Sequence, residues 1–200
     1  GREAIGEILR VRLMLVEALV EEELWDEALP LLAATLDACD ACSPSSSIDR
    51  VLAVTCNNVA SALVGRESRS PEMDELLERA ALWSRRAWLS CGNWMNDERS
   101  DYLLTLTYGA LNRPTEARDC ATRGLATIAA GGEENVDAAF LHVARARALF
   151  RLGESRAASD DLAAAESLAA TFDEPDWKAK LSGEIESLRA KIVELEREVA

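Results

Sequence analysis

Apolar residues recur along this sequence at the three- and four-residue spacing of amphipathic helices. The first segment, Ile5 to Glu23, carries a broad apolar face that consists of Ile8, Leu9, Met14, Leu15, Val16 and Leu19. Runs that alternate Val, Ile, Thr and aromatic residues with polar ones, as strands do, are missing. The pattern therefore predicts an all-α protein.

Capping and breaking residues predict where the helices begin and end. Ser70 can accept a hydrogen bond from an exposed backbone N–H, and Pro71 suits the first helical position. Ser46 can cap a helix in the same way, and Gly92 ends one. The predicted helices cover Ile5–Glu23, Trp25 to about Ala38, Ile48 to about Gly65, Pro71–Cys91, Asp97–Leu111, Pro114 to about Gly131, Asn135–Leu152, Ser155–Ala170 and Pro175 to the C-terminus.

Matching residues recur in successive pairs of these helices. A small residue stands early in each second helix, at Ala28, Ala80, Ala117 and Ala158. Four residues later come Leu32, Ser84, Ala121 and Leu162, and three residues beyond those come Thr35, Ala87, Gly124 and Ala165. The recurrence predicts four helical hairpins of one kind. Successive hairpins are expected to stack, because a lone hairpin cannot bury its own apolar face.

This pattern resembles the tetratricopeptide-repeat family. The first-helix contact position of that family matches Val16, Ala60, Thr105 and Ala146, and its turn glycine matches Gly153, with Asn112 and Glu23 in the other turns. The anchors Ala28, Ala80, Ala117 and Ala158 are 52, 37 and 41 residues apart, against a family period of about 34, which suggests a longer-repeat variant. The resemblance implies one helical-repeat domain over residues 1–200 that coils into a right-handed superhelix, with repeats at about 5–42, 48–92, 97–131 and 135–170 and a last helix at 175–200.

The composition restricts the function. The 200 residues contain 36 acidic and 22 basic side chains, a formal net charge of −14, which argues against binding to nucleic acid. No signal peptide or membrane-spanning run is evident. Five cysteines, an odd number, indicate reduced thiols in the cytoplasm.

The resemblance also implies a binding groove lined by first-helix residues. By register these are Leu13, Glu17, Asn57, Ser61, Tyr102, Leu106, Val143 and Arg147, with Arg99 and Phe150 beside them. Two aromatic rings and two arginines on a polar floor would suit a peptide with apolar anchors and some acidic residues. The alternative is that some of these residues belong to the core.

The last helix carries a heptad stripe of Leu181, Ile185, Leu188, Ile192, Leu195 and Val199. β-Branched residues alternate with leucines, a choice that favours parallel two-stranded coiled coils, in which Glu184 would face Arg189 of a partner and Lys191 would face Glu196. Alternatively the stripe packs on the preceding helix and caps the array. We favour the cap.

Residues that could support catalysis or bind a metal are few. His142 is the only histidine, and neither a phosphate-binding glycine loop nor a zinc-protease or EF-hand motif is present. Cys39 and Cys42 have the spacing of a zinc or redox pair, but no second pair supplies the other two ligands. Asp160 and Asp161 are adjacent on a helix and are expected to be solvated. We therefore expect no cofactor and no metal.

These observations together favour a non-catalytic scaffold or adaptor of the cytoplasm that binds a protein or peptide segment. The alternative is a self-association module, a homodimer joined through the last helix. An enzyme is a distant third.

Overall fold

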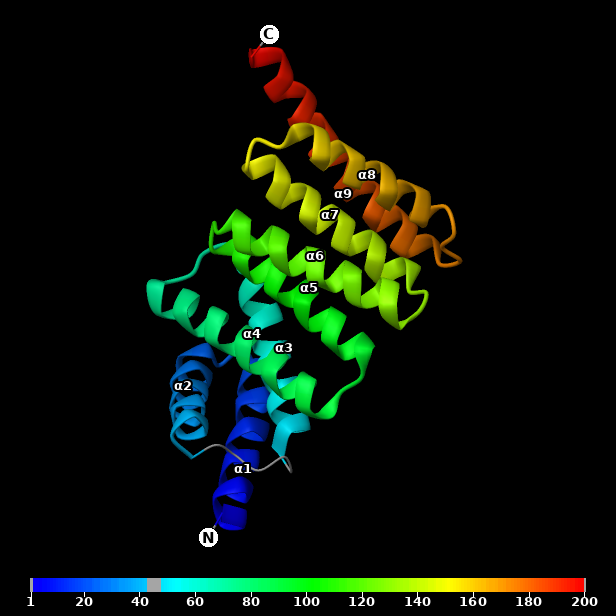
Figure 1. Cartoon of the computed structure of the whole chain (residues 1–200). Helices are drawn as coiled ribbons and strands as arrows, with labels where there is room; N and C mark the ends of the chain where they lie inside the picture. Colours follow the sequence, from blue (N-terminus) through cyan, green and yellow to red (C-terminus); the bar gives the residue numbers. More distant parts are fainter. Residues whose placement is uncertain (1, 43–47, 200) are drawn as a thin grey trace. The chain divides into compact units, whose positions relative to one another are not determined.

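The computed structural model describes residues 2–42 and 48–199. Within them the chain forms helices and no strand, which confirms the all-α prediction. The helices, shown in Figure 1, are α1 (Arg2–Glu21), α2 (Trp25–Cys42), α3 (Asp49–Val64), α4 (Pro71–Cys91), α5 (Trp94–Ala110), α6 (Pro114–Gly131), α7 (Asn135–Arg151), α8 (Ser155–Ala169) and α9 (Pro175–Val199). None of the helices in this part of the chain is both long and apolar enough to cross a membrane.

Most helix ends agree with the predicted capping residues. Ser70 accepts a hydrogen bond from the Met73 backbone N–H at 3.3 Å, and Pro71 is the first residue of α4. Prolines also begin α6 and α9. The predicted cap Ser46 lies outside the described residues.

The start of α5 differs from the prediction, because the helix begins at Trp94 and not at Asp97. The Asn93 side-chain oxygen accepts hydrogen bonds from the Met95 and Asn96 N–H groups at 3.0 and 3.3 Å. The Asn96 side chain in turn accepts from the Asn93 N–H at 3.1 Å. These reciprocal hydrogen bonds act as a capping box does, and they extend the helix by about one turn at its N-terminus.

The chain divides into two compact units, residues 1–103 and 104–200, with the boundary inside α5. In the first unit α1 packs on α2 and α3, and α3 packs on α4. In the second, α7 packs on α6, α8 and α9, and α8 packs on α9. The two cores contain large, fully buried side chains, Leu9, Leu13, Leu32, Leu36, Leu52, Leu63 and Leu77 in the first unit and Leu141, Leu162 and Leu181 in the second. The single domain over residues 1–200 stays a prediction.

Three hairpin turns share one backbone conformation. Glu23, Asn112 and Gly153 have φ angles of 58°, 57° and 78°, in the left-handed region. In each turn the next residue donates its N–H to a carbonyl five residues earlier, Leu24 to Leu19, Arg113 to Tyr108 and Glu154 to Leu149, at 2.8 to 2.9 Å. This bond defines a Schellman helix end. The α1–α2, α5–α6 and α7–α8 turns are thus equivalent.

The recurring packing residues that the sequence analysis matched between the four hairpins are all buried. The early small residues Ala28, Ala80, Ala117 and Ala158 are 0 to 1% exposed. The positions four and seven residues later are buried too, as are Val16, Ala60, Thr105 and Ala146 in the first helices. At one of them, the Ser84 hydroxyl of α4 donates to the Ala53 carbonyl of α3 at 3.0 Å. The small residues let helix backbones approach closely.

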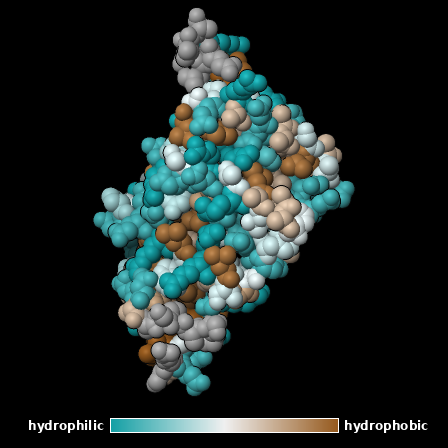
Figure 2. Space-filling view, in the orientation of Figure 1, coloured by the Kyte–Doolittle hydropathy of each residue, from teal (hydrophilic) through white to brown (hydrophobic). Residues whose placement is uncertain are grey.

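Surface residues are mostly hydrophilic on the face shown in Figure 2, where apolar residues form small groups between them. This agrees with a chain in which charged residues make up 29%. Large exposed apolar side chains are concentrated on α1, which carries Ile5, Ile8, Val11, Met14 and Leu15.

Candidate functional site

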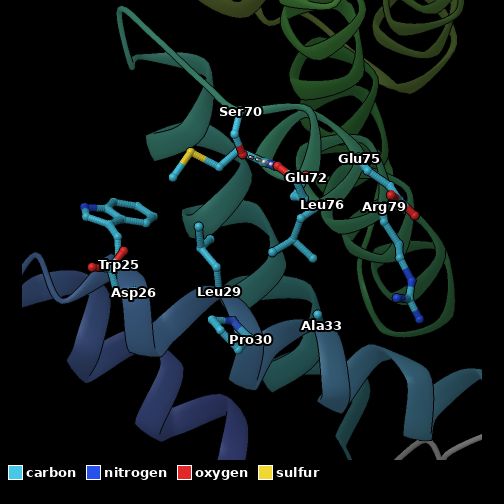
Figure 3. Close-up of a pocket in the computed structure, with 11 residues that line it drawn as sticks. Trp25, Asp26, Leu29, Pro30, Ala33, Ser70, Glu72, Glu75, Leu76 and Arg79 are labelled. Atoms are coloured by element: carbon cyan, nitrogen blue, oxygen red, sulfur yellow. Dashed lines mark hydrogen bonds between the residues drawn. The ribbon is translucent and has the colours of Figure 1, made fainter.

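A pocket of about 370 Å³ lies in the first unit between α2 and the N-terminal half of α4. Its volume is within the range of small-ligand and side-chain pockets. Figure 3 shows Leu29 of α2 and Leu76 of α4 pointing toward each other across it. The lining residues are Trp25, Asp26, Leu29, Pro30, Ala33, Ser70, Glu72, Met73, Glu75, Leu76 and Arg79.

The α2 wall of the pocket is one helix face. Trp25, Leu29 and Ala33 follow one another at intervals of four residues, so their side chains stand in a row. Pro30 lies in the middle of this wall and has no N–H, so it cannot donate to the carbonyl of Asp26 one turn earlier.

The loop before α4 holds Trp25 in place at one end of the pocket. The Arg66 guanidinium lies 5.0 Å from the centre of the Trp25 ring, a cation–π contact. Arg69 donates to the Leu63 and Arg66 carbonyls at 3.3 Å and to the Asp74 carboxylate at 2.6 Å. These bonds fix the loop between α3 and α4, so the tryptophan wall is preformed.

The α4 wall combines apolar side chains with a negative rim. Met73 and Leu76 are neighbours on one face, and Glu72 and Glu75 flank them. A hydrogen bond from the Ser70 hydroxyl, together with its own backbone N–H, lowers the pKa of Glu72. Glu72 is therefore ionised at neutral pH, and with Asp74 in the first turn it offsets the positive end of the α4 dipole.

Arg79 is the one cation among the described residues that line the pocket, and it is already paired. One Arg79 nitrogen lies 2.7 Å from the Asp37 carboxylate and 2.6 Å from that of Asp40, which ties α4 to α2. Burial alone would lower the pKa of Arg79, but these hydrogen bonds outweigh it and raise the pKa. The pocket lining thus combines three carboxylates, Asp26, Glu72 and Glu75, with the Arg79 guanidinium, whose charge is compensated by Asp37 and Asp40. The pocket is apolar at its centre and negative at its rim.

The predicted groove residues of the first unit divide between core and surface. Leu13 is 0% exposed and packs inside the unit, which corrects its assignment to a groove. Glu17 is half-buried and accepts a hydrogen bond from the Asn58 side chain of α3 at 3.2 Å. Asn57 donates to Asn58 at 3.3 Å, and Ser61 is exposed one turn further along α3. The Asn58–Glu17 hydrogen bond therefore joins α3 to α1, and the Asn57 side chain is bonded to Asn58.

Two further predicted residues of this unit lie in α5. Tyr102 is half-buried, and Arg99 is exposed, with its Nε 3.5 Å from the carboxylate of the buried Glu98. They stay candidates for contact with a ligand.

The groove residues of the second unit behave similarly. Val143 is 0% exposed, a second correction, because α7 packs on neighbours on both sides. Arg147 is bonded at 2.9 Å to Glu184 of α9, so its charge is not available for the acidic peptide that the sequence suggested. Leu106 and Phe150 are half-buried. In this unit, the predicted groove surface of aromatic rings and arginines therefore loses Val143 to the core, and its Arg147 is paired with Glu184.

The heptad stripe of α9 is covered by its own chain. Leu181, Ile185, Leu188 and Ile192 are 0 to 6% exposed and face α7 and α8. Glu184 and Arg189, the expected partners across a dimer, instead bond to Arg147 and Glu166 at 2.9 and 3.0 Å. The side chains of Leu195, Glu196 and Val199 lie outside the description. These four positions are therefore buried within their own chain, so they are not exposed for the dimer zipper that was the alternative to the favoured cap.

Asp161 differs from its expected solvated state, whereas Asp160 is exposed as expected. The side chain of Asp161 is 7% exposed, and it accepts hydrogen bonds from Arg145 at 2.6 and 2.7 Å. His142 Nδ1 lies 2.8 Å from the same carboxylate. These bonds join His142 and Arg145 of α7 to Asp161 of α8. The network is a structural contact between the two helices.

Metal-binding clusters of three or more His, Cys, Asp or Glu side chains are absent from the described residues. Cys39 is buried in α2, and the side chain of Cys42 lies outside the description.

Sequence reasoning missed the α2–α4 pocket because it sought a ligand only on the first helices of the hairpins. The row of Trp25, Leu29 and Ala33, broken by Pro30, was the available signal. The three side chains of this row are half-buried, so part of their apolar surface is left for a ligand to contact.

Comparisons with known proteins give no family, since no family model, no curated protein and no solved structure matches this chain.

Proposed function

We propose that this protein is a non-catalytic binding module of the tetratricopeptide type, and that it holds a basic amphipathic segment of a partner protein in the α2–α4 pocket. The observation that carries the proposal is the apolar pocket that three carboxylates line, while Arg79, the cation among its described lining residues, is already paired with Asp37 and Asp40.

The repeat part of the proposal is supported by the recurrence of one hairpin. Three turns share a left-handed residue five positions before a buried alanine, at Glu23, Asn112 and Gly153. The helices that pack together within each unit are one or two places apart in the sequence, the neighbour-only pattern of repeat arrays. A right-handed superhelix is the arrangement that the family resemblance implies for such hairpins.

The chemistry of the pocket supports this choice of ligand. Leu29, Met73 and Leu76 offer apolar contacts over about two helical turns, which suits an amphipathic helix with apolar residues on one side. The rim carboxylates suit lysine or arginine beside those residues, and they would repel an acidic segment. The partner surface is therefore apolar and basic, and not the acidic peptide that the sequence suggested.

The test uses a fluorescent amphipathic helix of leucine and lysine and its twin of leucine and glutamate. Anisotropy titration of the whole chain should show binding of the basic peptide and none of the acidic one. The paired change Glu72→Lys and Glu75→Lys should weaken binding about tenfold or more, because it reverses two charges in direct contact with the ligand. Ala33→Trp, which fills the pocket without a charge change, should weaken it as well.

A matched control separates the pocket from the overall negative charge. Asp160→Lys with Glu186→Lys makes the same net change at exposed positions of the second unit. Equal losses in the control and in the pocket variants would refute the pocket, because binding would then follow net charge alone. Absence of binding to the basic peptide would refute the ligand class.

A further inference from the structure

The outer side of α1 is a second apolar surface, opposite the side that packs on α2 and α3. Leu9, Leu13 and Val16 face the core and are at most 1% exposed. On the other side Ile8, Val11 and Leu15 are 55%, 62% and 49% exposed. Met14 and Ile5, at 58% and 44%, extend the same surface. Because only one of the two apolar sides of α1 is buried against the first unit, the other side is an exposed apolar surface suited to a partner.

The exposed residues follow a heptad register. Ala4, Ile8, Val11, Leu15 and Ala18 alternate four and three positions apart, so they form one stripe along about four turns of the helix. In coiled-coil notation Ile8 and Leu15 are a positions, and Ala4, Val11 and Ala18 are d positions. Such a stripe matches a second helix with the same spacing.

The flanks of the stripe identify that second helix. Glu7 occupies a g position and Arg12 the e position of the next heptad. In a parallel pair, g of one helix faces the following e of the other, so Glu7 would meet Arg12 of the partner twice across the two-fold axis. Met14 and Leu19 would meet in the same way at the next g and e positions. We propose that α1 pairs in parallel with α1 of a second copy of this chain.

The orientation follows from the same charges. An antiparallel pair brings e to e and g to g, so no antiparallel register forms the Glu7–Arg12 pair. A bilayer is a poor alternative for this face, because Glu3, Glu21 and Glu22 lie around it and the chain carries a net charge of −14. Within the first unit, α2 and α3 pack on the other side of α1, so they leave the stripe accessible.

Sedimentation of the full chain over a dilution series tests the proposal. The wild type should pass from dimer to monomer, with a dissociation constant on the order of micromolar because the stripe is short. Leu15→Asp should abolish the dimer. Leu82→Asp, at a leucine of α4 that is similarly exposed at 45%, should leave it unchanged. Circular dichroism shows whether each variant remains helical.

Charge reversal tests the parallel orientation. Glu7→Lys or Arg12→Glu alone should weaken the dimer about tenfold, because each change makes two repulsive pairs. The double variant Glu7→Lys with Arg12→Glu should restore it, and a mixture of the two single variants should form heterodimers. A monomer at every concentration would overturn the proposal, and a dimer insensitive to these exchanges would overturn the parallel pairing. Peptide binding in the α2–α4 pocket uses other residues, so it can succeed or fail independently.

Discussion

Glu23 and Gly153 occupy the same position of two different hairpin turns, and both have left-handed backbone φ angles, 58° and 78°. Each stands five residues before an alanine that is at most 1% exposed, Ala28 or Ala158. A charged residue with a full side chain thus takes the conformation of a glycine. The hairpin geometry is therefore what recurs along the chain, and it is kept even where the residue opposes it.

Exchanging these turn residues tests whether the two turns are equivalent. A Cβ at Gly153 would meet nothing within 4 Å, so Gly153→Ala should lower the free energy of unfolding by about 1 kcal/mol through backbone strain alone. Glu23→Gly should raise it by a similar amount, because the strain is relieved. Urea unfolding measures both. Changes of the same sign in the two variants would contradict the equivalence of the turns.

The helix crossing at Ala158 should not accept a large side chain. Ala158 is 0% exposed where α8 packs on α7, so Ala158→Trp should cost about 3 kcal/mol or more by overpacking. Ala163→Trp, at an exposed position of the same helix, should cost little. Thermal unfolding compares the two. A tolerated tryptophan at position 158 would disprove the close approach of the helices.

The carboxylate of Asp161 should make the fold sensitive to acid. Burial would raise the pKa of Asp161, but hydrogen bonds from Arg145 and His142 outweigh it, and the pKa lies below its ordinary value of 3.8. The folded state thus binds this proton less readily than the unfolded state. The stabilisation is complete above pH 3.8 and is lost as the pH falls through the lower folded pKa.

Asp161→Asn should therefore lower the free energy of unfolding by about 2 kcal/mol near neutral pH. The difference from the wild type should shrink in acid below the ordinary pKa. Asp160→Asn, the exposed neighbour, should change little at any pH. Urea titrations at several pH values give the comparison. A difference that persists undiminished in strong acid would show that the charge of Asp161 does not contribute.

Arg79 gives a prediction that separates stability from binding. Arg79→Gln removes the bridge to Asp37 and Asp40 and should destabilise the fold by at most about 1 kcal/mol, because the pair is partly solvated. It should also strengthen binding of the basic leucine–lysine peptide a few-fold, since the rim becomes more negative. Arg189→Gln, which loses its pair with Glu166, is the matched control and should leave the affinity unchanged. Weaker binding of the basic peptide to Arg79→Gln would contradict the role of the negative rim in binding.

The sequence predicted the helices well because turn residues and periodicity are local signals. The capped start at Ser70 was predicted from Ser70 and Pro71 themselves, and the turns at Asn112 and Gly153, which are left-handed in the structure, were matched through the family resemblance. The early start of α5 was missed because the Asn93–Asn96 exchange uses two asparagines in place of the usual serine and glutamate.

The faces of α1 show why packing was harder to predict. Ile8, Leu9, Leu15 and Val16 were assigned to one broad face, but in the structure Leu9 and Val16 are buried while Ile8 and Leu15 are exposed. Periodicity cannot decide which of two apolar sides faces the core when the whole helix is rich in such residues. Only the positions of α2 and α3 make that choice.

The candidate site was hardest to predict, for the same physical reason. Residues far apart in the sequence make the α2–α4 pocket, and the pairing of Arg79 with Asp37 and Asp40 removes a charge that the sequence alone counts as available. The burial of Leu13 and Val143 likewise depends on helices that pack from both sides.

Binding in the α2–α4 pocket is tested most directly by backbone amide chemical-shift mapping of the whole chain on addition of the leucine–lysine peptide. We predict that the largest shifts lie in residues 25–33 of α2 and 70–79 of α4, around the pocket. Largest shifts at Glu17, Asn57 and Ser61, or in the second unit with none at the pocket, would contradict this binding site.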